Sequence, residues 1–486
     1  MFILKKITSY LLIGSLLTPS FAFSAPGDYN LPDIGTTASG TLSISKELEY
    51  GDAYMRMLRA SSPLITDPVL SEYIQNLGHT LVANADGVKT PFHFFLLNNS
   101  QINAFAFFGG YIAIHSGLFL YTKDESELAS VMAHEIAHIT QRHLARHMED
   151  QAKKNPATIA ALVGSLMLAI VSPQAGIAAL QTTTAASMQS QINYTRSNEK
   201  EADRIGIQTL ARSHFDVEAM PTFFGRLADQ YRFASKPPEM LLTHPLPASR
   251  LTDSRLRAGQ YKRFIPALSE PFHLAQARII ARYSPYSQQA KFDWFNRRIK
   301  SSQSFSLTNS LNYGKALLYI DSRQYGKARD LLAPLIAKEP LNHFYLDSMT
   351  DLSLGEKKYD QAIKRLKHAL KTQPDNSVIQ LNLANALLDK GKAREAETIL
   401  NRETHNNPQD INGWSLLAKS AAIQGNRAGE LVARGEIFAL RARWDDAINN
   451  YINASQLSPL GSLDQARYDA RIDQLRQQRQ RFLALK

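Results

Sequence analysis

The chain has 486 residues, of which 44% are hydrophobic and 20% charged, a balance typical of folded proteins and unlike that of disordered chains. Its length predicts two to four domains, and its formal net charge of +11 favours anionic partners or surfaces. It contains no cysteine, which excludes disulfides, thiolate metal ligands, cysteine nucleophiles and a lipidated cysteine, so any metal must be bound by His, Asp or Glu.

The first 25 residues have the features of a secretory signal peptide. Lys5 and Lys6 precede an apolar run over residues 7–17, which is shorter than the ~20 residues needed to span a bilayer. We therefore expect export, with cleavage between Ala22 and Ala25. Loss of the two lysines leaves a net charge of +9. Export argues against nucleic acid as a partner, and leaves a membrane surface, acidic proteins or an ordinary basic surface as explanations of the charge.

The next segments predict helices around a few short strands. Helical patterning begins near Ser45 and continues past Leu81. Residues 91–97 and 104–114 are rich in aromatic and apolar side chains and predict strands. The Gly109-Gly110 pair indicates a bulge or turn between two strands, because glycine tolerates positive φ and close backbone approach.

Capping signals then mark the start of a helix over residues 128–146. Thr122 is paired with Glu125, and Asp124 with Glu127, in two overlapping capping boxes.

Further helices are expected downstream. The apolar segment 157–180 is interrupted by Pro173 and predicts a helix that covers the core or touches a membrane, since its unbroken part is too short to cross one. Helices follow over 193–211 and 219–231, and a proline-rich loop around 237–247 closes the first domain. Residues 270–305 predict an irregular helical connector.

The C-terminal part of the chain repeats with a period of 34 residues. Pro340, Pro374 and Pro408 follow this period, as do three alanines, and Tyr325 and Tyr359 share one register. The alanines in question are Ala328, Ala362 and Ala396. This period is the signature of tetratricopeptide repeats, in which small residues allow two helices to cross closely and proline ends the second helix. The segment 444–447 repeats the aromatic-x-x-Ala spacing out of phase, which predicts one more, irregular pair.

A metal-binding pattern lies in the helix predicted over 128–146. His134 and His138 are four residues apart, so they project from one helix face about 40° apart and can both bind a tetrahedral Zn²⁺. Glu135 lies beside them and can act as general base on a water molecule that attacks a peptide carbonyl. An exposed polar helix face is the alternative explanation of such a pattern. A second acidic helix containing Glu199, Glu201 and Asp203 favours the metal site, since a catalytic zinc needs a third protein ligand.

The combination of these motifs resembles the gluzincin peptidases of the HtpX and CAAX-prenyl-protease type. The resemblance rests on the segment 134–138 and on Glu199 with Ala202-Asp203 some sixty residues later. Residues 103–106, 109–111 and 115–118 are similar to the substrate-binding edge strand of that family and to its lead into the zinc helix. The similarity extends over the whole mature length, including the repeats, and the expected signal peptide agrees with it.

The resemblance implies roles for several residues. Glu199 would be the third zinc ligand, and Asp203, one turn later, would orient a ligand histidine without binding the metal itself. Glu201 would point about 160° away from Glu199, so it is expected to be a solvated charge. His244 would complete the zinc shell in a resting state, assist the oxyanion, or be an ordinary loop histidine. Arg250 would stabilise developing charge or pair with an acid.

Two more histidines and four phenylalanines are expected to lie outside the metal site. His143 and His147 would lie about 140° and 180° around a continuous helix from His138, so both are expected at the surface. The phenylalanines, which are expected to pack in the core and the edge strand, are Phe94, Phe105, Phe107 and Phe108. An exposed strand next to zinc would bind an extended substrate by adding it to the sheet.

The sequence thus predicts a mainly α protein with a small β-sheet, in which an α+β zinc metallopeptidase domain precedes a tetratricopeptide solenoid. The expected boundaries are 1–25 for the signal peptide, 26–265 for the peptidase, 266–306 for the connector and 307–486 for the repeats. The resemblance implies one Zn²⁺ per chain and a periplasmic endopeptidase with chaperone-like activity. It would act on misfolded or misassembled outer-membrane proteins and contact the β-barrel assembly machinery through its repeats.

A second hypothesis is a repeat-based scaffold or chaperone whose peptidase domain is mostly self-inhibited. A third, weaker one is a membrane-embedded peptidase.

Overall fold

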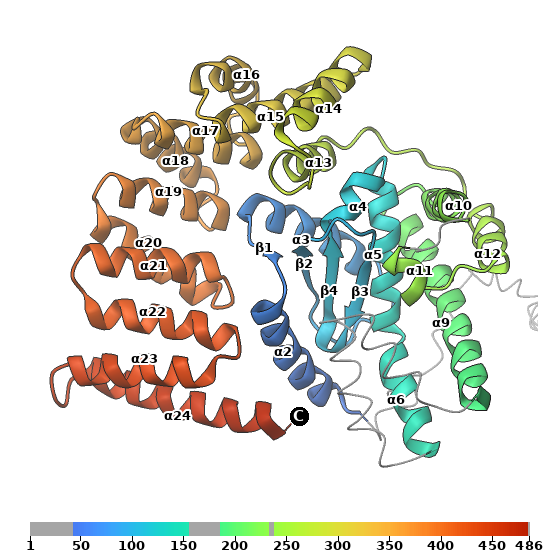
Figure 1. Ribbon diagram of the computed structural model, residues 1–486, viewed down its shortest axis with the longest axis horizontal. Coiled ribbons are helices and arrows are strands. Elements are labelled where there is room, and N and C mark those ends of the chain that lie inside the picture. Colours follow the sequence, from blue (N-terminus) through green and yellow to red (C-terminus); the bar gives the residue numbers. More distant parts are fainter. Residues whose placement is uncertain (1–41, 155–184, 233–237, 485–486) are drawn as a thin grey trace, which may run out of the picture.

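The computed structural model describes residues 42–154, 185–232 and 238–484. The expected signal peptide and the apolar segment 157–180 lie outside these ranges. Within them, no helix combines the length and the apolar character needed to cross a bilayer. The described chain is mainly helical with one small open sheet, as predicted (Figure 1).

The sheet has four strands in the order β1-β2-β4-β3. They are β1 (Leu64–Ile65), β2 (His93–Leu97), β3 (Ala104–Phe107) and β4 (Tyr111–His115). β2 and β4 are parallel, whereas β1 and β3 are antiparallel to their neighbours. The turn between β3 and β4 is the short helix η1 (Phe108–Gly110), in which both predicted glycines have positive φ, 75° and 83°. β3 is therefore an edge strand, and the glycine turn is confirmed.

Helices surround this sheet, and two of them differ from the prediction. The helix expected from residue 45 to beyond 81 is two helices, because β1 interrupts it. The helix expected over 128–146 also breaks, because Arg142 adopts a left-handed φ of 51°. The helices of this part are α2 (Ile44–Ser61), α3 (Pro68–Val82), α4 (Ser116–Tyr121), α5 (Glu125–Thr140), α6 (His143–Lys154), α9 (Ala185–Arg212), α10 (Ala219–Tyr231), α11 (Glu239–Thr243) and α12 (Ala248–Ala258). Asp124 caps α5 by accepting a hydrogen bond from the backbone N–H of Glu127, as the second capping box predicts.

The C-terminal part is an array of antiparallel helices. Its helices are α13 (Glu270–Arg282), α14 (Gln288–Ser301), α15 (Phe305–Asp321), α16 (Tyr325–Lys338), α17 (His343–Gly355), α18 (Tyr359–Thr372), α19 (Ser377–Asp389), α20 (Ala393–Asn406), α21 (Ile411–Ile423), α22 (Arg427–Leu440), α23 (Trp444–Leu457) and α24 (Leu463–Ala484). Each periodic alanine is 0% exposed, and α16, α18 and α20 each end two residues before a periodic proline. The helical repeat is confirmed.

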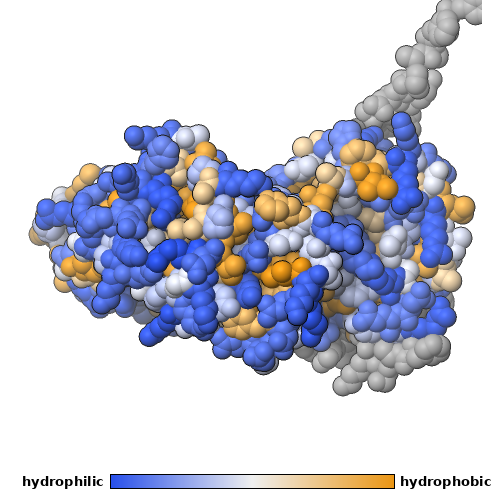
Figure 2. Space-filling model, turned by 90° about the horizontal axis from the view of Figure 1, so that it is seen from above, coloured by the Kyte–Doolittle hydropathy of each residue, from blue (hydrophilic) through white to orange (hydrophobic). Residues whose placement is uncertain are grey.

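The array curves around the side of the sheet that carries β1, α2 and α3 (Figure 1). One hydrophobic core continues from the sheet through α13 and α15 into the first repeats. Residues 270–305 are more regular than expected, and α13 is largely buried in this shared core. The buried Arg278 on α13 donates to Asp67, 2.6 Å away, and lies 2.7 Å from Asp347 of the repeats. Seen from above, the surface is mainly hydrophilic with separate apolar patches (Figure 2).

We predict that Gly110→Ala lowers the free energy of unfolding by about 1–3 kcal/mol or more. The φ of +83° is strained for alanine, and the added Cβ would overlap the carbonyl oxygen of Pro91. Gly326→Ala is the control, because that glycine lies in α16 with no atom near the added Cβ and should change stability by less than about 1 kcal/mol. Chemical denaturation followed by circular dichroism measures both, and equal losses would refute the account of this turn.

Candidate metal centre

Four candidate ligand atoms converge between α5, α9 and the segment after α11. They belong to His134 and His138 on α5, Glu199 on α9, and His244 directly after α11. Nε2 of His134 lies 3.0 Å from Nε2 of His138, 3.3 Å from Oε2 of Glu199 and 3.4 Å from Nδ1 of His244. Nε2 of His138 lies 3.3 Å from Oε1 of Glu199, and Nδ1 of His244 lies 3.1 Å from the same oxygen.

These distances fit a tetrahedral zinc ion. Ligand atoms about 2.0–2.1 Å from a tetrahedral metal lie about 3.3–3.4 Å from one another. The donor set of imidazole nitrogens and one carboxylate is also the one that zinc prefers in a protein without thiolates. The residues present therefore fit a zinc ion, with Nδ1 of His244 at the fourth corner.

The close approach of α9 to α5 brings Glu199 to the two histidines. Gly206 faces α5 so closely that an added Cβ would lie 3.2 Å from the backbone nitrogen of His134. Ala133, Ala137 and Ala202, all small residues, are almost completely buried. Small side chains at this crossing allow a carboxylate on α9 to share a site with histidines on α5.

Two buried carboxylates on α9 are balanced by one buried guanidinium. Arg250, 2% exposed, donates from Nε and Nη2 to the two oxygens of Asp203, at 2.5 and 2.9 Å, and its Nη1 lies 2.7 Å from Glu199. Burial alone would raise the pKa of Glu199, but the fields of His244 and Arg250 hold it well below its usual range. Burial also opposes ionisation of Asp203, and Arg250 outweighs it, so the pKa of Asp203 is lowered. Both acids are therefore carboxylates.

Asp203 and Arg250 support the cluster from behind. Oδ1 of Asp203 lies 3.0 Å from Nδ1 of His134, the ring nitrogen that faces away from the other candidate ligands. Arg250 also donates to the carbonyl of Pro245, next to His244. Of the two roles weighed for Arg250, these contacts favour pairing with acids.

Glu135 lies beside the cluster without belonging to it. Its side chain is buried, and among the described residues no donor forms a hydrogen bond to its Oε1. The nearest basic atom is Nε2 of His244, 3.5 Å away. A buried carboxylate oxygen without a donor costs free energy in a folded protein, so its position next to the cluster points to a partner supplied by substrate or water.

Two expectations about the neighbouring residues are wrong. His143 is buried and contacts His138, because α5 ends at Thr140 and the chain is kinked at Arg142 before α6 begins. The angles extrapolated along one continuous helix therefore do not apply. Glu201 is not a freely solvated charge: it is half-buried and bound by His143 and Arg146. His147 is half-buried and lies outside the cluster.

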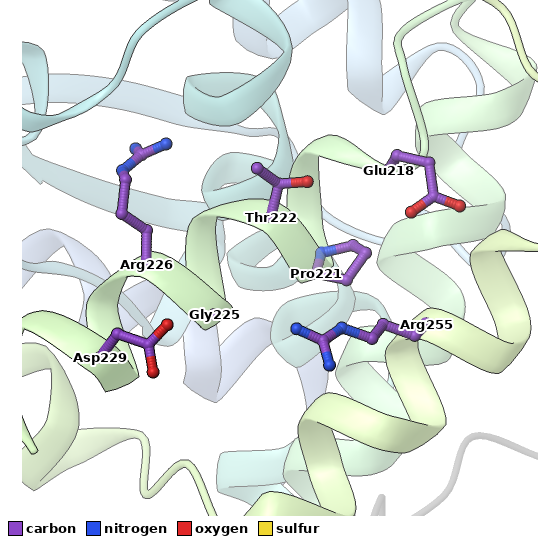
Figure 3. Close-up of a pocket in the computed structure, with 7 residues that line it drawn as sticks. All are labelled: Glu218, Pro221, Thr222, Gly225, Arg226, Asp229 and Arg255. Atoms are coloured by element: carbon purple, nitrogen blue, oxygen red, sulfur yellow. The ribbon is translucent and has the colours of Figure 1, made fainter.

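A polar cavity of roughly 550 Å³ lies elsewhere, between α10 and α12 (Figure 3). None of the residues that line it belongs to the cluster. Arg255 points toward Pro221, whereas Arg226 extends away from Arg255 and binds Glu127 in the first turn of α5. This contact holds α10 against the start of α5, the helix that carries His134 and His138.

We predict that Arg250→Met destabilises the metal-free protein by about 3–5 kcal/mol, because it leaves two buried carboxylates without their counter-charge. Arg257→Met on the same helix is the control. Its pair with Asp253 is about one-third exposed and should contribute about 0–1 kcal/mol. Urea denaturation measures the free energy of unfolding of both variants. Similar decreases would show that the buried ion pairs of Arg250 stabilise the protein no more than the surface pair does.

The sequence matches Peptidase family M48 over residues 68–258 and the tetratricopeptide repeat over residues 353–420. A Vibrio cholerae protein is 60% identical over 475 residues, which cover 98% of each chain. The Escherichia coli protein named beta-barrel assembly-enhancing protease is 52% identical over 485 residues, 99% of this chain and 98% of its own. The mitochondrial metalloendopeptidase OMA1 of Bos taurus is 29% identical over 160 residues, 32% of this chain and 30% of its own. The resemblance noted from the motifs is thus confirmed, and the chain belongs to peptidase family M48 and is a metallopeptidase.

Proposed function

We propose that this metallopeptidase is a zinc endopeptidase whose metal ligands are His134, His138 and Glu199. The observation that carries the proposal is the set of ligand atoms at the spacing of a zinc tetrahedron, with the buried carboxylate of Glu135 next to it. Metal-dependent hydrolysis of a peptide bond uses a Lewis acid and a general base side by side, as this arrangement would provide.

Glu135 is the general base of this proposal. Its carboxylate accepts a proton from water while the water oxygen bonds to the scissile carbonyl carbon. It then gives that proton to the leaving amine nitrogen as the carbon–nitrogen bond breaks, so the base is regenerated. A bound zinc ion would polarise the carbonyl and lower the pKa of water. Asp203 would orient His134, and Arg250 would hold Asp203 and Glu199 ionised.

His244 closes the site in the conformation described. Its Nδ1 lies at the corner that a catalytic zinc leaves to water or substrate, and its Nε2 faces Glu135. We propose that this is a resting state, and that the segment carrying His244 must move before substrate enters. This supports the self-inhibited form of the enzyme among the alternatives for His244.

The edge strand β3 is proposed to bind the substrate backbone. Within the described ranges no strand pairs with its outer edge, and α5 packs against it. An extended polypeptide can add to this edge by main-chain hydrogen bonds, which suits an enzyme that cleaves different sequences.

We further propose that the protein works in the periplasm on outer-membrane proteins whose assembly has failed, and that its repeats contact these proteins or the machinery that inserts them. The support is the name of the Escherichia coli relative, the matching repeats and the expected signal peptide. In the fold, the array contacts the β1 side of the sheet, three strand spacings or roughly 14 Å from β3. A chaperone-like function of the array can therefore operate while the metal site is closed.

We predict that Glu135→Gln lowers proteolysis of casein at least about 100-fold, because the general base is lost, while zinc binding is retained. Glu49→Gln, which changes a partly exposed carboxylate on α2 paired with Lys46, is the matched control and should keep full activity. Metal analysis and casein digestion of both variants test this. Full activity of Glu135→Gln would exclude the mechanism. Assembly of outer-membrane proteins that survives in this variant would support a separate chaperone-like function.

We predict that His244→Ala increases the rate of casein cleavage several-fold, because it opens the fourth corner of the site. The measurement is kcat and KM for wild type and variant at equal zinc content. A decrease in kcat at unchanged zinc content would instead assign His244 to stabilisation of the oxyanion and contradict the resting-state proposal.

A further inference from the structure

His143 contacts the candidate ligand His138 on the side away from the metal cluster. The contact exists because α5 ends at Thr140, the backbone is kinked at Arg142, and α6 begins at His143. Residues far away in the sequence hold Arg142 in place, because its guanidinium donates to Glu47 and to the carbonyl of Leu42. The His143 ring is thereby buried against His138 instead of facing solvent.

The two rings and a carboxylate form a chain of hydrogen bonds. Nε2 of His138 faces the cluster, and its Nδ1 lies 2.8 Å from Nδ1 of His143. On the far side of the second ring, Nε2 of His143 lies 3.2 Å from Oε2 of Glu201. The same oxygen accepts a hydrogen bond from Arg146, 2.7 Å away.

One arrangement of protons satisfies every atom of this chain. If Nε2 of His138 binds the metal, its neutral ring carries the hydrogen on Nδ1 and donates it to Nδ1 of His143. His143 then carries its own hydrogen on Nε2 and donates it to Glu201.

We propose that His143, held by Glu201, is a positioning residue that fixes the tautomer and the orientation of the metal ligand His138. The inference rests on the proposed metal site. The other ligand histidine, His134, has a direct carboxylate partner in Asp203, whereas His138 reaches its carboxylate through a second imidazole. The acidic helix α9 thus supports both histidines, from Asp203 and from Glu201.

The experiment compares variants that keep or lose one ring nitrogen. The side-chain amide of asparagine places a polar atom near the position of Nδ1, and that of glutamine near Nε2. His143→Asn can therefore accept the hydrogen bond of His138, whereas His143→Gln and His143→Ala cannot. Competition with a chelating dye measures the zinc dissociation constant of each purified full-length protein, prepared without metal.

We expect His143→Ala and His143→Gln to weaken zinc binding about 10–100-fold, and His143→Asn to stay within about 3-fold of wild type. Glu201→Ala should show a smaller loss, because it removes only the second link. His368→Ala, an exposed histidine on α18, is the control and should bind as wild type. Thermal unfolding of the metal-free proteins shows whether each variant folds. The zinc affinities of His143→Asn and His143→Gln are compared once both variants unfold at the same temperature.

Each outcome decides between the claims. Equal zinc affinity of wild type and all three His143 variants overturns the positioning role and leaves the metal site intact. Equal weakening by Asn, Gln and Ala also overturns it, since only the packing of the ring would then matter. A wild-type protein that binds no zinc refutes the proposed metal site itself, and the inference falls with it.

Discussion

The proposed metal site depends on two carboxylates that are buried on one face of α9. Glu199 and Asp203 lie where water cannot stabilise their charge, so they need compensation from the protein. Arg250 supplies it with three charge-assisted contacts, and the histidines supply the rest. Without this guanidinium the two acids would take up protons or move apart. The ion pairs that join α9 to α12 would then be lost. The ligand geometry is thus a consequence of a buried charge balance.

The same guanidinium limits how the site can open. Arg250 belongs to the segment that carries His244, and it also binds the carbonyl of Pro245. Its contacts with α9 anchor the start of α12, whereas His244 lies before this anchor, as the residue that ends α11. In the proposed opening, the stretch from His244 to Pro247 would move and the contact of Arg250 with the carbonyl of Pro245 would break, while the pair of Arg250 with Asp203 would stay in place.

The repeats are not an independent attachment to the peptidase part. Arg278 is buried between Asp67 at the start of α3 and Asp347 in the repeat helix α17, so the two parts share a charge cluster as well as a hydrophobic core. His343 reaches Glu72 on α3, and Arg56 on α2 donates to the carbonyl of Ala439. These contacts hold a curved array around one side of the sheet. β3 and the helices α5 and α9 lie on the other side (Figure 1).

The sequence by itself determined what local geometry dictates. The i, i+4 spacing placed His134 and His138 on one helix face, and the 34-residue period indicated the repeats. The family resemblance of the motifs selected Glu199 and Asp203 on a second helix. The tertiary structure decided the rest. His143 is buried because Arg142 is held by Glu47, 95 residues earlier, and this contact ends a helix that the local pattern continued. Likewise, the fourth corner taken by His244 depends on how α11 packs, and the side of the sheet that the repeats cover depends on contacts with α2 and α3. Such contacts join residues far apart in the chain, and no periodicity encodes them.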